Sequence, residues 1–107
     1  MKTFSKEDIA SISDCLGLGG IPSNWSGLDV TLPLLERIRE DGAVIVIKLD
    51  GERTGPDDTG PYTVIASGKP LGDKLIRTDA RTIEEALCHL IGNYADHVWG
   101  ITPHVQP

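Results

Sequence analysis

Residues 82–98 read TIEEALCHLIGNYADHV and carry the most regular pattern in the chain. Thr82 and Glu85 have the spacing of a capping box, in which two side chains satisfy free amide groups at a helix start. Apolar residues then recur at the three- and four-residue intervals of a buried helix face: Ile83, Ala86, Leu87, Leu90, Ile91, Tyr94 and Val98. The pattern predicts a long helix that begins at Thr82, buries this stripe and stops at Gly100.

Three segments before this helix predict strands. Residues 43–49 (AVIVIKL) are β-branched and almost continuously apolar, which is typical of a strand covered on both faces, at least at its start. Residues 62–67 (YTVIAS) alternate, with Tyr62, Val64 and Ala66 on one side. A glycine- and proline-containing turn follows, and a short third strand is expected from Lys74 to Thr78.

Two helices are expected before the strands. Ser5 and Asp8 form a capping pair that predicts a helix over residues 6–16, with Gly17 in the left-handed position that ends it. Residues 17–30 contain four glycines and a proline and predict a structured loop. A second helix is expected to start near Thr31, because Pro33 is tolerated only in a first turn. Its expected inner face is formed by Leu32, Leu35 and Ile38.

The order α-α-β-β-β-α indicates an α+β fold, in which an antiparallel three-stranded sheet packs against helices. The chain has 107 residues, which fits one domain over residues 1–107, and we expect the tail at 101–107 to be frayed. Hydrophobic residues make up 39% of the sequence, which is enough to build a core.

The charge balance constrains the kind of partner. The chain has sixteen acidic residues and ten basic ones, which are scattered along it, and the formal net charge is −6. Binding to phosphates needs clustered lysine and arginine, so the composition argues against direct contact with nucleic acid and against an anionic membrane surface. An acidic surface would attract a basic protein partner, although moderate acidity also serves solubility alone.

No signal peptide is expected from residues 1–5, and the longest apolar run, residues 43–47, is too short to span a bilayer. Two cysteines, Cys15 and Cys88, do not form a disulfide framework. The sequence therefore predicts a cytoplasmic protein with reduced thiols.

The sequence carries no recognisable motif for a cofactor or for catalysis. Gly17, Gly19 and Gly20 follow a helix, whereas the glycines of a dinucleotide loop follow a strand and open a helix. The candidate metal ligands do not have zinc-site spacing: Cys15, Cys88, His89, His97 and His104. Because neighbouring helix positions do not face one another, Cys88 and His89 are not expected to form a catalytic pair. We predict no cofactor, no metal site and no catalytic residue.

The candidate partner-binding residues gather in one loop. Asp50, Glu52, Asp57 and Asp58 lie between two predicted strands, in a segment that also contains three glycines. The ligand order of an EF-hand is absent, and a solvated connection is the simpler interpretation. The alternative is an acidic loop that meets a basic partner, and these four residues are the predicted binding site.

Residues 62–91 resemble part of a HicB-type antitoxin, in which a strand led by an aromatic residue, a Gly/Pro turn and a short strand precede a helix. Here that helix opens with Thr82-Ile83-Glu84-Glu85-Ala86. In size and acidity the chain is also similar to bacterial immunity proteins, which neutralise a cognate nuclease toxin. Both resemblances imply a small acidic domain that covers the basic face of a toxin.

Three hypotheses follow from the sequence. The first is a non-enzymatic binding module, an immunity-type or antitoxin-type inhibitor of a basic nuclease toxin. The second is a phage- or prophage-type accessory domain whose partner is another copy of itself. The third is a small enzyme of unrecognised class, which is the least favoured because the sequence carries no catalytic motif.

Overall fold

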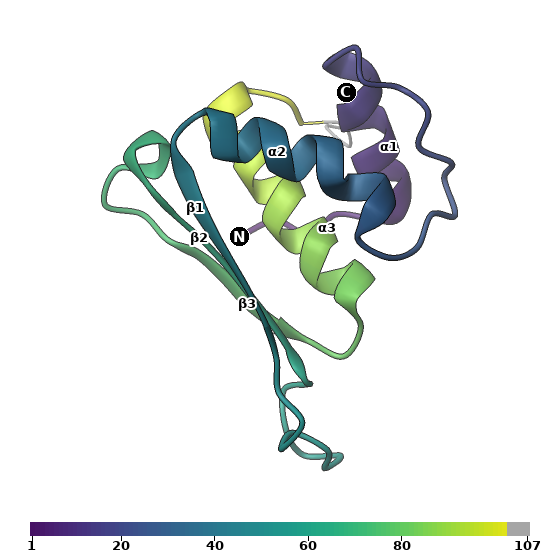
Figure 1. Ribbon diagram of the computed structural model, residues 1–107, viewed down its shortest axis with the longest axis vertical. Helices are drawn as coiled ribbons and strands as arrows, with labels where there is room; N and C mark the ends of the chain where they lie inside the picture. The colour runs from purple at the N-terminus through teal and green to yellow at the C-terminus, as the bar shows by residue number, and fades with distance from the viewer. Residues whose placement is uncertain (103–107) are drawn as a thin grey trace.

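The computed structural model describes residues 1–102, and Figure 1 shows how their elements are arranged. The helices are α1 (Lys6–Cys15), α2 (Leu32–Glu40) and α3 (Ile83–Tyr94), and the strands are β1 (Ala43–Leu49), β2 (Tyr62–Gly68) and β3 (Ile76–Ala80). Short helical turns lie at Asp29–Thr31, Lys69–Leu71 and Ala95–Trp99. The predicted α-α-β-β-β-α order and the α+β fold are confirmed. Within residues 1–102, no helix combines the length and the apolar composition needed to cross a lipid bilayer.

The three strands form one antiparallel sheet in the order β1-β2-β3. Figure 1 shows α1, α2 and α3 on the same side of this sheet, so the sheet has one covered face and one face without helices. Neighbouring residues of a strand point to opposite faces. The covered face contains the fully buried Val64, Ala66 and Ile76.

The prediction that the first strand is covered on both faces is wrong. Val44 and Val46 of β1 are 56% and 47% exposed, because no helix packs on the side of the sheet to which they point. A run of β-branched residues favours a strand for conformational reasons even where half of its side chains face solvent. Apolar continuity therefore indicated the strand correctly and its surroundings incorrectly.

The third strand lies two residues later than the predicted Lys74–Thr78. Tyr62 pairs with Ala80, and this register carries β3 to Ala80. Lys74 instead belongs to the preceding turn, where its amide donates to the carbonyl of Leu71. Asp79 thereby falls within the sheet, where polar side chains satisfy its carboxylate.

Helix α1 has the predicted ends. Ser5 and Asp8 exchange side-chain and backbone hydrogen bonds at its start, which completes the capping box. Gly17 adopts a left-handed conformation after the last turn (φ 74°). The amides of Gly17 and Leu18 donate to the carbonyls of Asp14 and Ser13, the bonding pattern of a Schellman motif.

Helix α2 begins as predicted, and its buried face differs from the predicted one at a single residue. Leu34, Leu35 and Ile38 are buried, whereas Leu32 is 51% exposed. The prediction for Leu32 is therefore wrong. The spacing of Leu32, Leu35 and Ile38 fits a helix face, but Leu34, Leu35 and Ile38 fit one equally well, and packing on the sheet selects the second set.

Helix α3 is the longest helix in residues 1–102, and its predicted stripe lies in the core. Leu87, Leu90, Ile91 and Tyr94 are fully buried. The α-helix ends earlier than predicted, at Tyr94, and a wider π turn continues to Trp99. Gly100 then has the expected left-handed conformation (φ 70°). The predicted fraying of the tail concerns mainly residues 103–107, which lie outside the described residues.

The N-terminal segment is fastened along α3. The amide of Lys2 donates to Asn93 Oδ1 (3.0 Å), and Asn93 Nδ2 donates back to the Lys2 carbonyl (2.9 Å). Phe4 is buried against Gly92, where a methyl group in place of the glycine hydrogen would overlap the phenyl ring. Asn93 and Gly92 thus fix the path of the chain before α1 begins.

Candidate partner-binding site

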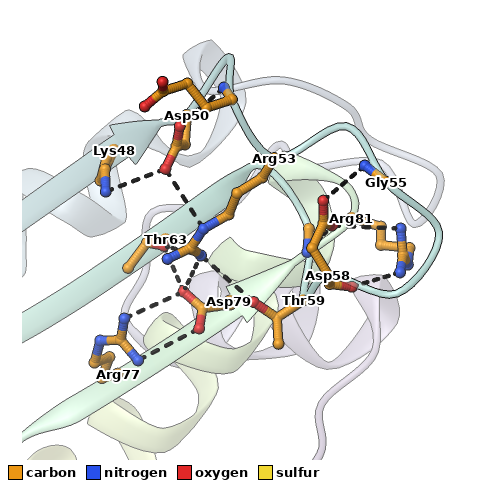
Figure 2. A network of polar contacts seen from close by, with 12 residues as sticks. Lys48, Asp50, Arg53, Gly55, Asp58, Thr59, Thr63, Arg77, Asp79 and Arg81 are labelled. Atoms are coloured by element: carbon orange, nitrogen blue, oxygen red, sulfur yellow. Dashed lines mark hydrogen bonds and ion pairs between the residues drawn. The ribbon is translucent and has the colours of Figure 1, made fainter.

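The predicted acidic loop, residues 50–61, joins β1 to β2 and extends beyond the layer of helices (Figure 1). Its backbone closes where the amide of Asp50 donates to the carbonyl of Pro61 (2.7 Å). Figure 2 shows that polar contacts connect the loop to the end of the sheet. The loop is therefore held by specific bonds, and its four acidic residues occupy different surroundings.

The carboxylate of Asp50 is bound to neighbouring groups of the same molecule. Its carboxylate lies 3.3 Å from Lys48 Nζ and 3.4 Å from Arg53 Nε, and it accepts a hydrogen bond from the Glu52 amide (3.0 Å). The amide bond and the contact with Lys48 lower the pKa of Asp50. Only 17% of the side chain is exposed, so this charge is largely compensated before any partner arrives.

Asp58 also has a structural role. Its two carboxylate oxygens accept hydrogen bonds from the amides of Gly55 (2.8 Å) and Gly60 (3.0 Å), which fold the loop tip (Figure 2). Arg81 reaches the same turn and donates to the backbone carbonyls of Pro56 (3.0 Å) and Asp58 (2.6 Å). Asp58 therefore shapes the loop and has little capacity left for an external cation.

Glu52 and Asp57 are the two carboxylates of the loop that face solvent. Both residues are exposed, and neither takes part in the ion pairs found among residues 1–102. The predicted cluster of four acids is thus two groups: a structural pair, Asp50 and Asp58, and an outward pair, Glu52 and Asp57. The outward pair is the part of the predicted site that can meet a partner.

Arg53 is the residue that the sequence analysis missed. Its guanidinium donates to Thr63 Oγ1 (3.3 Å), Asp79 Oδ1 (3.0 Å) and Thr59 Oγ1 (3.4 Å), in addition to its ion pair with Asp50. It thereby connects the loop to β2 and β3, as Figure 2 shows. An arginine within an acidic loop was the available signal, but its partners are identified only by the register that pairs Thr63 with Asp79.

Asp79 lies at the centre of these contacts. Thr63 Oγ1 donates to its carboxylate, Arg53 bonds to the same oxygen, and Arg77 lies 3.4 Å away. The hydrogen bond from Thr63, followed by the contacts with the two arginines, lowers the pKa of Asp79. The side chain is 15% exposed. A carboxylate in this position is kept ionised and holds two cations beside the sheet.

The face of the sheet opposite the helices, here called the open face, adjoins this polar cluster. Its side chains follow from strand alternation and register: Val44, Val46, Lys48, Thr63, Ile65, Ser67, Arg77 and Asp79. The apolar members Val46 and Ile65 are direct cross-strand partners, and Val44 is the next residue on the same side of β1. The open face thus combines an apolar area with a polar end fixed by Arg53.

The charges around the open face nearly cancel. Lys48, Arg53 and Arg77 supply three cations, and Asp50 and Asp79 supply two carboxylates. The net acidity of the chain is therefore located elsewhere, including at Glu52 and Asp57 on the loop tip. The open face is thus an apolar area with a nearly neutral border, and an acidic loop tip projects beside it.

The cysteine and histidine residues do not come together as a metal centre. In residues 1–102, no three His, Cys, Asp or Glu side chains lie close enough to hold a metal ion. Cys15 is exposed on α1, while Cys88 is buried in α3. Burial raises the pKa of the Cys88 thiol to about 11, so this thiol stays protonated at neutral pH. His104 lies outside the described residues.

Comparison with known proteins gives no family for this chain: no protein-family model, curated protein or solved structure matches it. The resemblance of residues 62–91 to HicB-type antitoxins and the similarity to immunity proteins therefore stay predictions.

Proposed function

We propose that this protein is a non-enzymatic protein-binding module that docks a basic partner on its open face. The observation that carries the proposal is the exposure of Val44 and Val46 on a sheet face that no helix of residues 1–102 covers. Apolar side chains that form a contiguous patch exposed to solvent are typical of a surface that binds another protein, whereas single exposed apolar residues are ordinary. Ile65 extends the same area onto β2.

The basic character of the partner is supported by the loop. Glu52 and Asp57 project from a backbone that Asp58 and Arg53 hold in shape, so their charges are presented at little cost in conformational entropy. The net charge of −6 adds long-range attraction for a cation-rich surface. Apolar burial supplies affinity in this arrangement, and the loop supplies orientation and rate.

Among basic partners, we place a nuclease toxin first, which makes the protein an immunity-type or antitoxin-type inhibitor acting in the cytoplasm. Nuclease surfaces that bind phosphates are rich in lysine and arginine. Carboxylates such as those of Glu52 and Asp57 can occupy the positions that phosphates would take, while the open face excludes the nucleic acid by volume.

The proposal is tested by affinity capture from the native host with three immobilised proteins. These are the wild type, the double variant Val44→Thr/Val46→Thr, and the control Leu32→Thr, which changes an equally exposed apolar residue on α2. Threonine preserves β propensity and removes apolar area. We expect a basic protein that the wild type and the control retain and the double variant releases. If no protein shows this pattern, the open face is not the docking surface.

Self-association is the second candidate, because a second copy could cover Val44, Val46 and Ile65 face to face. Light scattering over a range of protein concentrations distinguishes the two. A monomer at all concentrations supports a foreign partner. A dimer that the Val44→Thr/Val46→Thr variant dissociates supports self-association.

A further inference from the structure

The outer edge of β3 has no strand beside it. In the order β1-β2-β3, the strand pairs with β2 along one edge, and no other strand of residues 1–102 pairs with the opposite edge. Backbone amide and carbonyl groups along a free edge are a template for a further strand. What covers this edge therefore decides whether it is available to a ligand.

Two hollows follow the free edge of β3. The first, of about 560 Å³, is lined by Thr78, Asp79 and Ala80 of β3, by the N-terminal segment at Thr3–Lys6, and by α3 from Glu84 to His89. The second, of about 360 Å³, is lined by Ile76 and Lys74 and, on the other side, by Met1, Lys2 and Asn93. None of the residues that line either hollow belongs to β1 or β2, so both lie at the edge of the sheet. We call them together the β3 groove.

The far wall of the β3 groove is held in place. Asn93 bonds to both backbone groups of Lys2, and Lys2 Nζ pairs with Asp96 (3.0 Å). Phe4 is seated on Gly92. The N-terminal segment is thus attached to α3 rather than to β3, which leaves the space beside the strand open and preformed.

One end of the β3 groove is acidic. Glu84 and Glu85 line the larger hollow, against the single cation of Lys6, while the carboxylate of Asp79 is bound to Arg53 and Arg77. Glu84 accepts a hydrogen bond from the Gly27 amide (2.8 Å), and this bond is the main cause of its lowered pKa. Glu85 is exposed. Within residues 1–102, the imidazole atom His89 Nε2, from a residue that lines the same hollow, is buried without a hydrogen-bond partner.

We propose that the β3 groove binds an extended peptide segment with basic side chains, which pairs with the free edge of β3 as a fourth strand. Five residues at about 3.3 Å each match the length of β3. The basic side chains of the bound peptide lie beside Glu84 and Glu85. Main-chain pairing provides the affinity, and the two hollows receive side chains, as in other cases of β-strand addition. This inference rests on the proposed binding of a basic protein and adds a second contact to it.

The test uses a phage-displayed library of random twelve-residue peptides, selected on the wild-type protein. An enriched peptide is then synthesised and titrated against the wild type, Glu85→Lys, and the control Glu40→Lys, which reverses an exposed charge on α2. We expect enrichment of peptides with lysine or arginine. Glu85→Lys should weaken binding about tenfold or more, since it places like charges together, and Glu40→Lys should change it less than about twofold. Amide resonances of residues 76–80 should shift on binding.

Backbone pairing is tested on the peptide itself. In a strand, only alternate amides point to a given edge. Two peptides are made: one is N-methylated at the odd positions and the other at the even positions. The peptide whose methylated amides point away from β3 should bind as the parent does, and the other should fail. Equal binding of both, no enrichment above the library background, or amide shifts confined to other elements would overturn the proposal. So would concentration-dependent shifts of residues 76–80 without peptide, because a second copy would then occupy the edge. Val44→Thr/Val46→Thr should bind the peptide normally, so failure here and failure of the open face are separate results.

Discussion

The two faces of the sheet are made by alternate residues of the same three strands, and they differ in what meets them. On the covered face, Val64, Ala66 and Ile76 contact a layer of helices and are fully buried. On the open face, Val44 and Val46 have equally apolar side chains and remain half exposed. The comparison shows that the side chains of β1 alone do not determine which face is the core. The core face is the one whose side chains meet the apolar side chains of the helices.

The largest expected effect is on the covered side. Leu90→Ala removes a fully buried side chain of α3 and should lower the free energy of unfolding by about 2–5 kcal/mol, the usual range for such a change in a core. The matched change Val44→Ala on the open face should cost about 1 kcal/mol or less, mainly through β propensity. Denaturant unfolding of both variants measures the difference. Similar values would mean that the two faces are not distinguished by burial.

The second effect concerns the polar end of the open face. Arg53→Met keeps much of the side-chain volume and removes the donor to Asp79 and Thr63. We expect a loss of about 1–3 kcal/mol, because a partly buried carboxylate is left with fewer partners. Arg77→Met is the control, since Arg77 touches Asp79 only at 3.4 Å and is itself exposed. A smaller loss for Arg53→Met than for Arg77→Met would contradict the central position of Arg53.

The third effect is a pH dependence. The pKa of Asp79 is lowered by the hydrogen bond from Thr63 and by Arg53, so the folded state favours its ionised form. Its stabilising contribution is therefore complete above the unfolded pKa of about 4 and is lost as pH falls through the lower folded value. Unfolding of Asp79→Asn and wild type should differ most near neutral pH and converge in acid. A difference that stays constant down to about pH 2 would exclude this carboxylate as the source.

The smallest expected effect separates the two groups of loop acids. Glu52→Gln/Asp57→Asn should leave stability within about 0.5 kcal/mol of wild type, since exposed charges contribute little. Asp50→Asn/Asp58→Asn should cost more, because these side chains bind the loop backbone. With the captured partner, Glu52→Gln/Asp57→Asn should slow association about tenfold at low salt, with less effect at high salt. If the wild type and the Glu52→Gln/Asp57→Asn variant associate at the same rate at every ionic strength, the loop only connects β1 to β2 and does not contact the partner.

Local sequence signals predicted the fold well. Capping residues at Ser5 and Thr82 and the stripe of α3 indicated where helices begin and which side is buried, because these signals act within one or two turns. The exposure of Leu32 on α2 and the open face of β1 could not be obtained this way. Both depend on which side of the sheet the helices occupy, and that is decided by contacts between segments far apart in the chain.

The sequence predicted where in the chain the candidate site lies, but not which of its acidic residues are bonded within the molecule. Acidic residues between two strands correctly pointed to an exposed loop. Their division into a structural and an outward pair arises from Arg53 and from backbone amides, and a count of charges contains neither. The β3 groove was not anticipated, because it is formed by an N-terminal segment that lies against a helix about ninety residues later in the chain.

The contact of Phe4 and Lys2 with Gly92 and Asn93 also constrains the order of folding. The hydrogen bonds between Lys2 and Asn93 join residues separated by 91 positions, so the loop they close contains nearly all of the described chain. During synthesis, the segment around Lys2 and Phe4 must wait for α3 to leave the ribosome before it can reach its place, whereas the β1-β2-β3 hairpins can pair earlier. The N-terminal segment is thus expected to dock last. Until then the far wall of the β3 groove is missing, so a growing chain presents the free edge of β3 without the segment that limits which strands can reach it.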